Sequence, residues 1–188
     1  MSDPQVYIAL IHYPVYNKRM EVITTSVTNL DLHDISRAAY TYQVKGFYVV
    51  HPLASQRELI HQILDYWQNG YGGQYNPDRR EAFQILRVAS SISEVLTGIR
   101  EETGSVPRIA TTDARIYPNS ISYRSLREEI SAAKSPYLLM FGTGWGLEKQ
   151  TMLGADYILE PIAADRPYNH LSVRSATAIT LDRLLGDI

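Results

Sequence analysis

The chain has 188 residues, of which 45% are hydrophobic and 20% charged, and its formal net charge is −2 at pH 7. This composition is ordinary for a soluble globular protein, and no stretch approaches the roughly 18 to 20 apolar residues that a membrane helix needs. The absence of cysteine excludes disulfides, thiolate metal sites and a cysteine nucleophile. The small net charge gives no global attraction to nucleic acid, so an RNA partner would have to be bound by a local patch.

Short apolar runs alternate with helix-like segments along the whole chain. Most of these runs are rich in β-branched or aromatic residues, as β-strands are. Strands are predicted at residues 6–11, 46–50, 83–88, 108–112, 137–141 and 157–160, and helices at residues 30–42, 56–66, 91–103, 122–133, 147–153 and 170–185. Strands separated by helices indicate an α/β fold, with a mostly parallel sheet of about six strands and helices on both faces.

The chain shows neither an internal repeat nor a linker rich in Pro, Gly or Ser, so we expect a single domain over residues 1–188. The first apolar run has no basic segment before it and is typical of a first strand rather than a signal peptide. We therefore expect a cytoplasmic protein.

One segment, residues 67–83, departs from the alternating pattern. It contains three glycines, two tyrosines and the adjacent pair Arg79 and Arg80. We predict an exposed loop. It is either a solvated connection or a partner-binding loop, since aromatic rings and arginines suit base stacking and phosphate contact.

A glycine-rich turn, LLMFGTGWGLEK, follows the fifth predicted strand and contains Gly142, Gly144 and Gly146. A phosphate-binding P-loop would need Lys and Ser or Thr after its last glycine, and the dinucleotide fingerprint has the spacing G-x-G-x-x-G after a first strand. Neither matches. Three glycines in five residues at the carboxyl end of a strand indicate positive φ angles or the close approach of a ligand to the backbone. The alternative is a tight structural turn.

Two further loops have a similar layout. The run RIATTDAR places Thr111, Thr112 and Asp113 at a strand end, and ILEPIAADRPYNH contains a strand ending at Glu160 and a polar loop before the last helix. We expect Asn169 to be the N-cap of that helix. Because loops at the carboxyl ends of parallel strands share one edge of the sheet, all three could converge on one crevice.

These motifs together resemble a known family. FGTGWGL, then LEPI, then YNHLSVRSA before a long final helix resemble the SPOUT superfamily of S-adenosylmethionine-dependent RNA methyltransferases. The chain is most similar to a small family related to the catalytic domain of tRNA guanine-N1 methyltransferases. HYPVYNK and TNLDLHDISRAAYTY near the N-terminus also fit, so the resemblance covers essentially the whole chain.

The resemblance implies a deep trefoil knot over about residues 107–188, a homodimer, and an active site that borders the dimer interface. It also implies that S-adenosyl-L-methionine is held in the knot loops largely by backbone groups. The residues that it assigns to the cofactor are Thr111 and Thr112 in the first loop, Phe141, Gly142, Thr143, Gly144 and Gly146 in the second, and Glu160, Pro161, Ile162, Asn169, His170, Leu171, Ser172 and Arg174 in the third.

Departures from the family pattern bear on the reaction. The branch that methylates the ribose 2′-oxygen often has an acidic residue where this chain has Thr143, and Ser172 and Arg174 replace the Asn and Ser of its L-N-V-S run. These differences favour methylation of a base, such as guanine N1, in tRNA or rRNA.

Methyl transfer to a base nitrogen needs positioning, removal of a proton where one is present, and stabilisation of charge on the base carbonyl. Asp165 and Asp31 are the candidate general bases. Arg37 is the candidate for charge stabilisation, because DLHDISRAA resembles the first SPOUT motif, and Arg166 and Arg174 are alternatives.

The segment HYPVYNK follows the first strand and could line the substrate mouth, with His12 and Asn17 beside Lys18 and Arg19 as phosphate contacts. His12 could equally be a structural histidine. No histidine spacing matches a metal-binding motif such as H-E-x-x-H, so we expect no metal.

Two other functional classes remain open. One is a non-catalytic protein of the same fold that binds S-adenosylmethionine or RNA. The other is a nucleotide-binding α/β protein that uses the glycine turn for phosphate, which the failed P-loop and dinucleotide spacings weaken.

Overall fold

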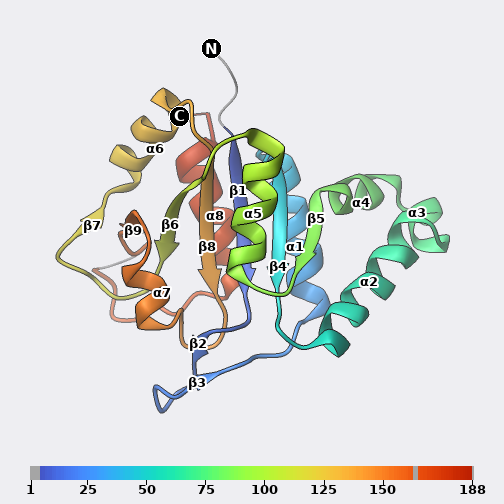
Figure 1. Ribbon diagram of the computed structural model, residues 1–188, viewed down its shortest axis with the longest axis horizontal. Helices are drawn as coiled ribbons and strands as arrows, with labels where there is room; N and C mark the ends of the chain where they lie inside the picture. The colour runs from blue at the N-terminus through green and yellow to red at the C-terminus, as the bar shows by residue number, and fades with distance from the viewer. Residues whose placement is uncertain (1–4, 163–164, 188) are drawn as a thin grey trace.

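The computed structural model describes residues 5–162 and 165–187, and its centre is one parallel sheet (Figure 1). Seven strands are arranged in the order β5-β4-β1-β8-β6-β9-β7, and all neighbouring strands run parallel. Their bounds are β1 Val6–Ile11, β4 Gly46–Val50, β5 Leu86–Ala89, β6 Arg108–Thr112, β7 Ser120–Ile121, β8 Tyr137–Gly142 and β9 Tyr157–Leu159. The predicted α/β fold with a parallel sheet is confirmed.

The central strand β1 is buried on both faces because its sequence, VYIALI, is apolar throughout. Alternate side chains enter two different hydrophobic cores. Ile8 and Leu10 belong to one core, and Tyr7, Ala9 and Ile11 belong to the other. The continuous apolar pattern therefore places β1 in the middle of a three-layer molecule, between β4 and β8.

Helices cover both faces of the sheet. Apolar residues of α1, α2, α6 and α8 enter the first core, and those of α5 and α7 enter the second. Figure 1 shows α5 in front of the strands and α1 and α8 behind them. The bounds are α1 Asn29–Thr41, α2 Ala54–Gln68, α5 Ile92–Thr103, α6 Tyr123–Ala132, α7 Lys149–Leu153 and α8 Val173–Leu185. In the described parts of the chain, no helix is both long and apolar enough to cross a membrane.

The segment predicted as an exposed loop is instead helical, and this prediction was wrong. Helices α3 (Tyr71–Tyr75) and α4 (Pro77–Ala82) are followed by the 3-10 turn η1 (Phe83–Ile85). The side chain of Asn76 accepts a hydrogen bond from the Arg79 amide at 3.0 Å and caps α4. The Arg79 guanidinium lies 5.1 Å from the centre of the Trp67 ring. The segment looked like a loop because of its glycines and polar residues. In the structure, the polar Asn76 caps a helix and the glycines allow close packing against α2.

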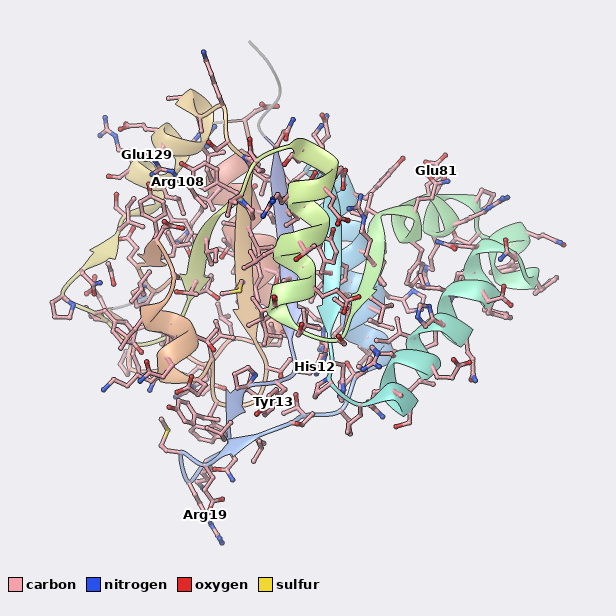
Figure 2. All side chains as sticks on the ribbon, viewed as in Figure 1. His12, Tyr13, Arg19, Glu81, Arg108 and Glu129 are labelled. Atoms are coloured by element: carbon pink, nitrogen blue, oxygen red, sulfur yellow. The ribbon has the colours of Figure 1, made fainter. Side chains whose placement is uncertain are left out.

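Two strand predictions also differ from the structure. The strand expected at residues 83–88 begins at Leu86, because the preceding residues form η1. The sheet has seven strands rather than about six, since β7 has only two residues and too little pattern to detect. A separate antiparallel pair, β2 (Val15–Tyr16) and β3 (Val22–Ile23), forms an arm below the sheet. Figure 2 shows Arg19 at the tip of this arm.

Candidate functional site

A cavity of about 920 Å³ lies at the carboxyl edge of β6, β8 and β9. This is the edge at which open parallel sheets bind ligands. Four segments distant in sequence build its wall. They contribute Thr25, Ser26, Thr28 and Asp31, with Met20 from the arm; Thr112, Asp113, Ala114 and Arg115; Phe141 to Gly146; and Glu160, Ile162, residues 168–174, Ala176 and Thr180, together with Tyr123.

The three glycines of the turn after β8 are required for different reasons. Gly144 and Gly146 have φ angles of 59° and 97°, in the region that favours glycine. A Cβ atom on Gly142 would lie 2.7 Å from the Leu147 amide nitrogen, and one on Gly144 would lie 2.7 Å from the Tyr16 carbonyl oxygen. A Cβ on Gly146 would be in ordinary van der Waals contact with the Asp113 carboxylate at 3.5 Å, so Gly146 lies close to the first loop, and both line the cavity.

The glycine turn is fixed by backbone hydrogen bonds to the segment after β1. The Trp145 amide donates to the Tyr16 carbonyl at 2.8 Å, and the Tyr16 amide donates to the Gly146 carbonyl at 2.9 Å. The Glu148 amide also donates to the Pro14 carbonyl at 3.1 Å. We call this contact between residues 14–16 and 145–148 the clamp. It sets where the turn stands relative to the sheet.

A buried chain of side chains supports the same turn. Thr143 Oγ1 donates to the Ile11 carbonyl at 3.1 Å, so Thr25 Oγ1 must be the donor in its hydrogen bond to Thr143 Oγ1. Thr25 Oγ1 therefore accepts from His12 Nδ1 at 3.0 Å. His12 Nε2 is then the unprotonated nitrogen, and it has no hydrogen-bond partner among the described residues. The chain runs in one direction from His12 to Ile11.

His12 is fully buried and packs against His51, with ring centres 5.4 Å apart. Burial, and then the neighbouring His51, lower the pKa of His12 from its usual 6.5 to about 4. Burial also lowers the pKa of His51, whose Nε2 donates to the Thr25 carbonyl at 2.9 Å because Nδ1 accepts from the Leu53 amide. Both imidazoles are neutral at pH 7. His12 lies at the lower end of β1 in Figure 2, and it is not among the residues that line the cavity.

The first loop presents an ion pair to the cavity. Arg115 binds both oxygens of Asp113, with Nε–Oδ1 at 2.9 Å and Nη2–Oδ2 at 2.7 Å. The Tyr117 hydroxyl also donates to Asp113 Oδ2 at 3.3 Å. Because the Asp113 side chain is almost fully buried, these bonds satisfy a charge that would otherwise be costly. The first loop is thereby held in one shape.

The third loop is tied to the first. Asn169 Nδ2 donates to the Ala114 carbonyl at 3.0 Å. The expectation that Asn169 caps the last helix is wrong: α8 begins at Val173, and the Ser172 side chain caps it by accepting from the Ser175 amide at 3.2 Å. Asn169 joins two walls of the cavity instead.

Glu160 has a structural partner at the back of the cavity. Its Oε1 accepts from the Tyr123 amide at 3.0 Å, at the start of α6. A carboxylate at a helix N-terminus is favoured by the exposed amides and the helix dipole. Glu160 thus orients α6 and still lines the cavity.

An ion pair joins the starts of α1 and α8. Arg174 Nη1 lies 2.9 Å from Asp31 Oδ1, and its Nε lies 3.4 Å from Asp34 Oδ2. The Asp31 side chain is only 8% exposed and that of Arg174 is 31% exposed. Both line the cavity, so the structure presents an oriented guanidinium there, with Asp31 Oδ2 outside that hydrogen bond.

Most of the predicted residues converge on this cavity. Those in its wall are Asp31, Thr112, Phe141, Gly142, Thr143, Gly144, Gly146, Glu160, Ile162, Asn169, His170, Leu171, Ser172 and Arg174. The described lining does not include Thr111, Pro161, His12, Asn17, Lys18, Arg19, Arg37, Asp165 or Arg166. Thr111, Pro161 and His12 are buried, whereas Lys18, Arg19, Arg37, Asp165 and Arg166 are exposed. Asn17 organises the arm, its Oδ1 accepting from the Arg19 amide at 2.8 Å.

Several lining residues were missed from the sequence. Thr25 and Ser26 lie in a stretch without a recognised motif, and Thr28 is the first residue of the TNLDLHDISRAAYTY segment, from which other residues were chosen. The same holds for Arg115, Trp145 and Tyr168, which lie within the three loops. The ring of Trp145 and that of Tyr168 each lie beside His170, with centres 6.5 Å and 5.5 Å from it. Within residues 5–162 and 165–187, no group of three or more His, Cys, Asp or Glu side chains could hold a metal ion.

Replacing Gly144 by alanine should destabilise the protein through the clamp. The left-handed backbone alone costs about 1–2 kcal/mol, and contact with the Tyr16 carbonyl adds to it, so we expect a loss of about 3 kcal/mol in urea unfolding. Gly104→Ala is the matched control, because Gly104 has a φ of 74° and open space around it. Equal losses in the two variants would show that the clamp contributes nothing.

Stability should fall on acidification because of His12. Its folded pKa is lower than its unfolded pKa, so the unfolded chain binds the extra proton between about pH 6.5 and pH 4 and stability is lost as pH falls through that window. This residue should make the free energy of unfolding, measured in urea, about 2 kcal/mol lower at pH 5 than at pH 7.5. In His12→Gln the pH dependence should be weaker by that amount; an unchanged dependence would exclude His12 as its source.

Comparisons with known proteins agree with this geometry. The profile of a family of SAM-dependent RNA methyltransferases matches residues 5–186. An uncharacterised protein of Aquifex aeolicus is 45% identical over 186 residues, covering 99% of this chain and 91% of that protein. A tRNA (guanine-N(1)-)-methyltransferase of Nitratidesulfovibrio vulgaris is 44% identical over 184 residues, which cover 97% of this chain but only 42% of that protein.

The fold is also found among solved structures. The TrmH/SpoU tRNA modifying enzyme of A. aeolicus aligns with a TM-score of 0.59 and 13% identity, covering 97% of this chain and 74% of that one. At this identity the likeness concerns the fold alone. The family match and the curated relatives confirm the resemblance seen in the glycine turn and its two companion loops, and the chain belongs to the family of SAM-dependent RNA methyltransferases.

Proposed function

We propose that the cavity binds S-adenosyl-L-methionine and that the protein transfers its methyl group to a base of tRNA or rRNA, at a position like guanine N1. The observation that carries this proposal is the convergence of the three loops on one cavity at the carboxyl edge of the sheet. The curated relatives named tRNA (guanine-N(1)-)-methyltransferases, at 44% and 41% identity, support the choice of a base over a ribose oxygen. The chain spans 42% of their length, so the substrate is our proposal.

The residues present fit this cofactor. Gly146 lies close to the first loop, since a Cβ placed there would be in van der Waals contact with Asp113 at 3.5 Å and Arg115 at 3.7 Å, so the second loop presents bare backbone to the cavity beside that ion pair. The lining carries three carboxylates, Asp31, Asp113 and Glu160, against the two guanidinium groups of Arg115 and Arg174. A slight excess of negative charge suits a positively charged sulfonium. Apolar atoms of Phe141, Ile162 and Leu171 line the same space, and the rest of the ligand requires such a surface.

When bound, S-adenosylmethionine supplies an activated methyl group. The protein then has to orient the acceptor base and stabilise the charge that develops on it. Arg174 presents a fixed positive charge to the cavity, where it would stabilise negative charge on a base carbonyl. Asp31 orients Arg174 through Oδ1, and its Oδ2 is the group best placed to accept a proton. Asp165 remains a second candidate base from the exposed part of the third loop.

We further propose that the protein works as a homodimer in the cytoplasm and that the segment 107–188 is knotted as in SPOUT proteins. The dimer is carried over from the resemblance to the SPOUT superfamily. Arg37 lies exposed on α1 and outside the cavity lining of its own chain. If Arg37 takes part in methyl transfer, it does so at the cavity of a second copy. The knot is carried over from the resemblance of the three loops to that superfamily, and the bond from Asn169 to the Ala114 carbonyl places the third loop against the first.

Cofactor binding is tested by Gly146→Val, which places a β-branched side chain in the cavity wall between the second loop and the first. Calorimetric titration with S-adenosylhomocysteine should show binding to the unaltered protein and at least a tenfold loss in the variant. Gly104→Val is the control, since its backbone is strained in the same way far from the cavity. Labelled methyl transfer to total RNA, followed by nucleoside analysis, then tests the reaction: label in 1-methylguanosine supports the proposal, and label only in 2′-O-methyl nucleosides contradicts it.

Arg37→Ala should leave S-adenosylhomocysteine affinity unchanged, because the residue lies outside the lining of its own cavity. It should lower methyl transfer, in which Arg37 is the candidate for charge stabilisation. Arg174→Ala should lower methyl transfer as well. If Arg37 serves a partner's site, mixing the two inactive variants should restore part of the activity, since one site of a mixed dimer has both arginines. An inactive mixture would exclude the shared site.

A further inference from the structure

Three exposed aromatic side chains line the cavity, and packing in the hydrophobic cores does not account for them. We call Trp145, Tyr168 and His170 the aromatic cluster. Trp145 is 53% exposed and Tyr168 is 76% exposed, and both line the cavity together with His170. Neither Trp145 nor Tyr168 belongs to the two hydrophobic cores of the described residues. Burial of these rings does not explain their position.

The backbone of Trp145 explains only part of its position. Its amide is used in the clamp, donating to the Tyr16 carbonyl, and any residue other than proline would supply that bond. The indole ring projects from a turn whose neighbours, Gly144 and Gly146, have no side chains to cover it. The turn thus presents a bare aromatic face beside the proposed methyl donor.

The chemistry of the surroundings indicates the kind of ligand. The guanidinium groups of Arg115 and Arg174 are engaged by Asp113 and Asp31, so the cavity has little free positive charge for phosphates. Single-stranded RNA is recognised largely through unstacked bases that stack on aromatic side chains. The volume of about 920 Å³ is near the upper end of the range for small-molecule sites, which leaves room for a base beside a cofactor.

We infer that the aromatic cluster is the stacking platform for an unpaired base of the RNA substrate, with Trp145 providing the main face and Tyr168 the outer edge. This inference rests on the proposed function and adds the residues that would hold the substrate base. It concerns the second and third loops, and is independent of the cations Lys18 and Arg19 on the arm.

Trp145 can report on its own contacts. The sequence has two tryptophans, and the other, Trp67, stacks on Phe83 at a centre distance of 6.2 Å beside the first core. In Trp67→Phe, emission comes from Trp145 alone. Adding total bacterial tRNA and rRNA should quench this emission, and in Trp145→Phe the emission of Trp67 should not change.

Affinity measurements complete the test. Trp145→Ala should weaken RNA binding about 5- to 150-fold in a filter assay, the range for loss of one stacked base, while Trp145→Phe stays near the unaltered protein. S-adenosylhomocysteine affinity should be unchanged in both. Tyr75→Ala is the matched control: Tyr75 is 75% exposed and pairs with another tyrosine, Tyr71, but lies on α3, away from the cavity (Figure 1).

Four results would overturn the inference. Unchanged RNA affinity in Trp145→Ala would show that no base stacks there. Equal loss of S-adenosylhomocysteine binding would assign the ring to the cofactor. Loss of the dimer in sedimentation, with RNA affinity retained, would assign the cluster to a contact with a second copy. If the unaltered protein binds the cofactor but no RNA, the RNA substrate itself is refuted, and the stacking platform with it.

Discussion

The clamp between residues 14–16 and 145–148 determines the form of the whole carboxyl edge. Strands β1 and β8 are neighbours in the sheet, so the segments that leave them begin side by side. Reciprocal hydrogen bonds between Tyr16 and the glycine turn then keep these segments together beyond the last strand residues. Because the turn has two glycines with positive φ, it can bend back to make these bonds without side-chain collisions. The position of one wall of the cavity follows from this contact.

The other walls are attached to the clamp by polar contacts of defined direction. The chain from His12 through Thr25 to Thr143 joins the end of β1, the segment before α1 and the glycine turn. Asn169 joins the third loop to the first, and Asp31 joins α1 to α8 through Arg174. A buried polar group without a partner is costly, so such a network favours one arrangement of the loops over many. A preorganised site of this kind is suited to holding a reactive group in line with its acceptor.

Sequence patterns predicted the fold well because apolar strands and capped helices are local signals. They also predicted the three loops, since the residues at strand ends of a parallel sheet meet at one edge. They failed where the deciding contact was distant in sequence. Asn169 looked like a helix cap, but its partner is the Ala114 carbonyl. For His12 the sequence left two possibilities open, a residue of the substrate mouth or a structural histidine, and its burial and its bond to Thr25 favour the second. Residues 67–83 looked like a loop because of their glycines and polar residues. The glycines instead pack against the end of α2, a contact that composition does not reveal.

The most direct test of this account is hydrogen–deuterium exchange with and without S-adenosylhomocysteine. If the three loops form one cofactor site on the clamp, the ligand should slow exchange together in residues 112–115, 142–146 and 168–174. Exchange in α3 and α4, which lie far from the cavity, should not change. Protection confined to one loop, or a binding signal without protection at the glycine turn, would contradict the claim that the clamp builds the cofactor site.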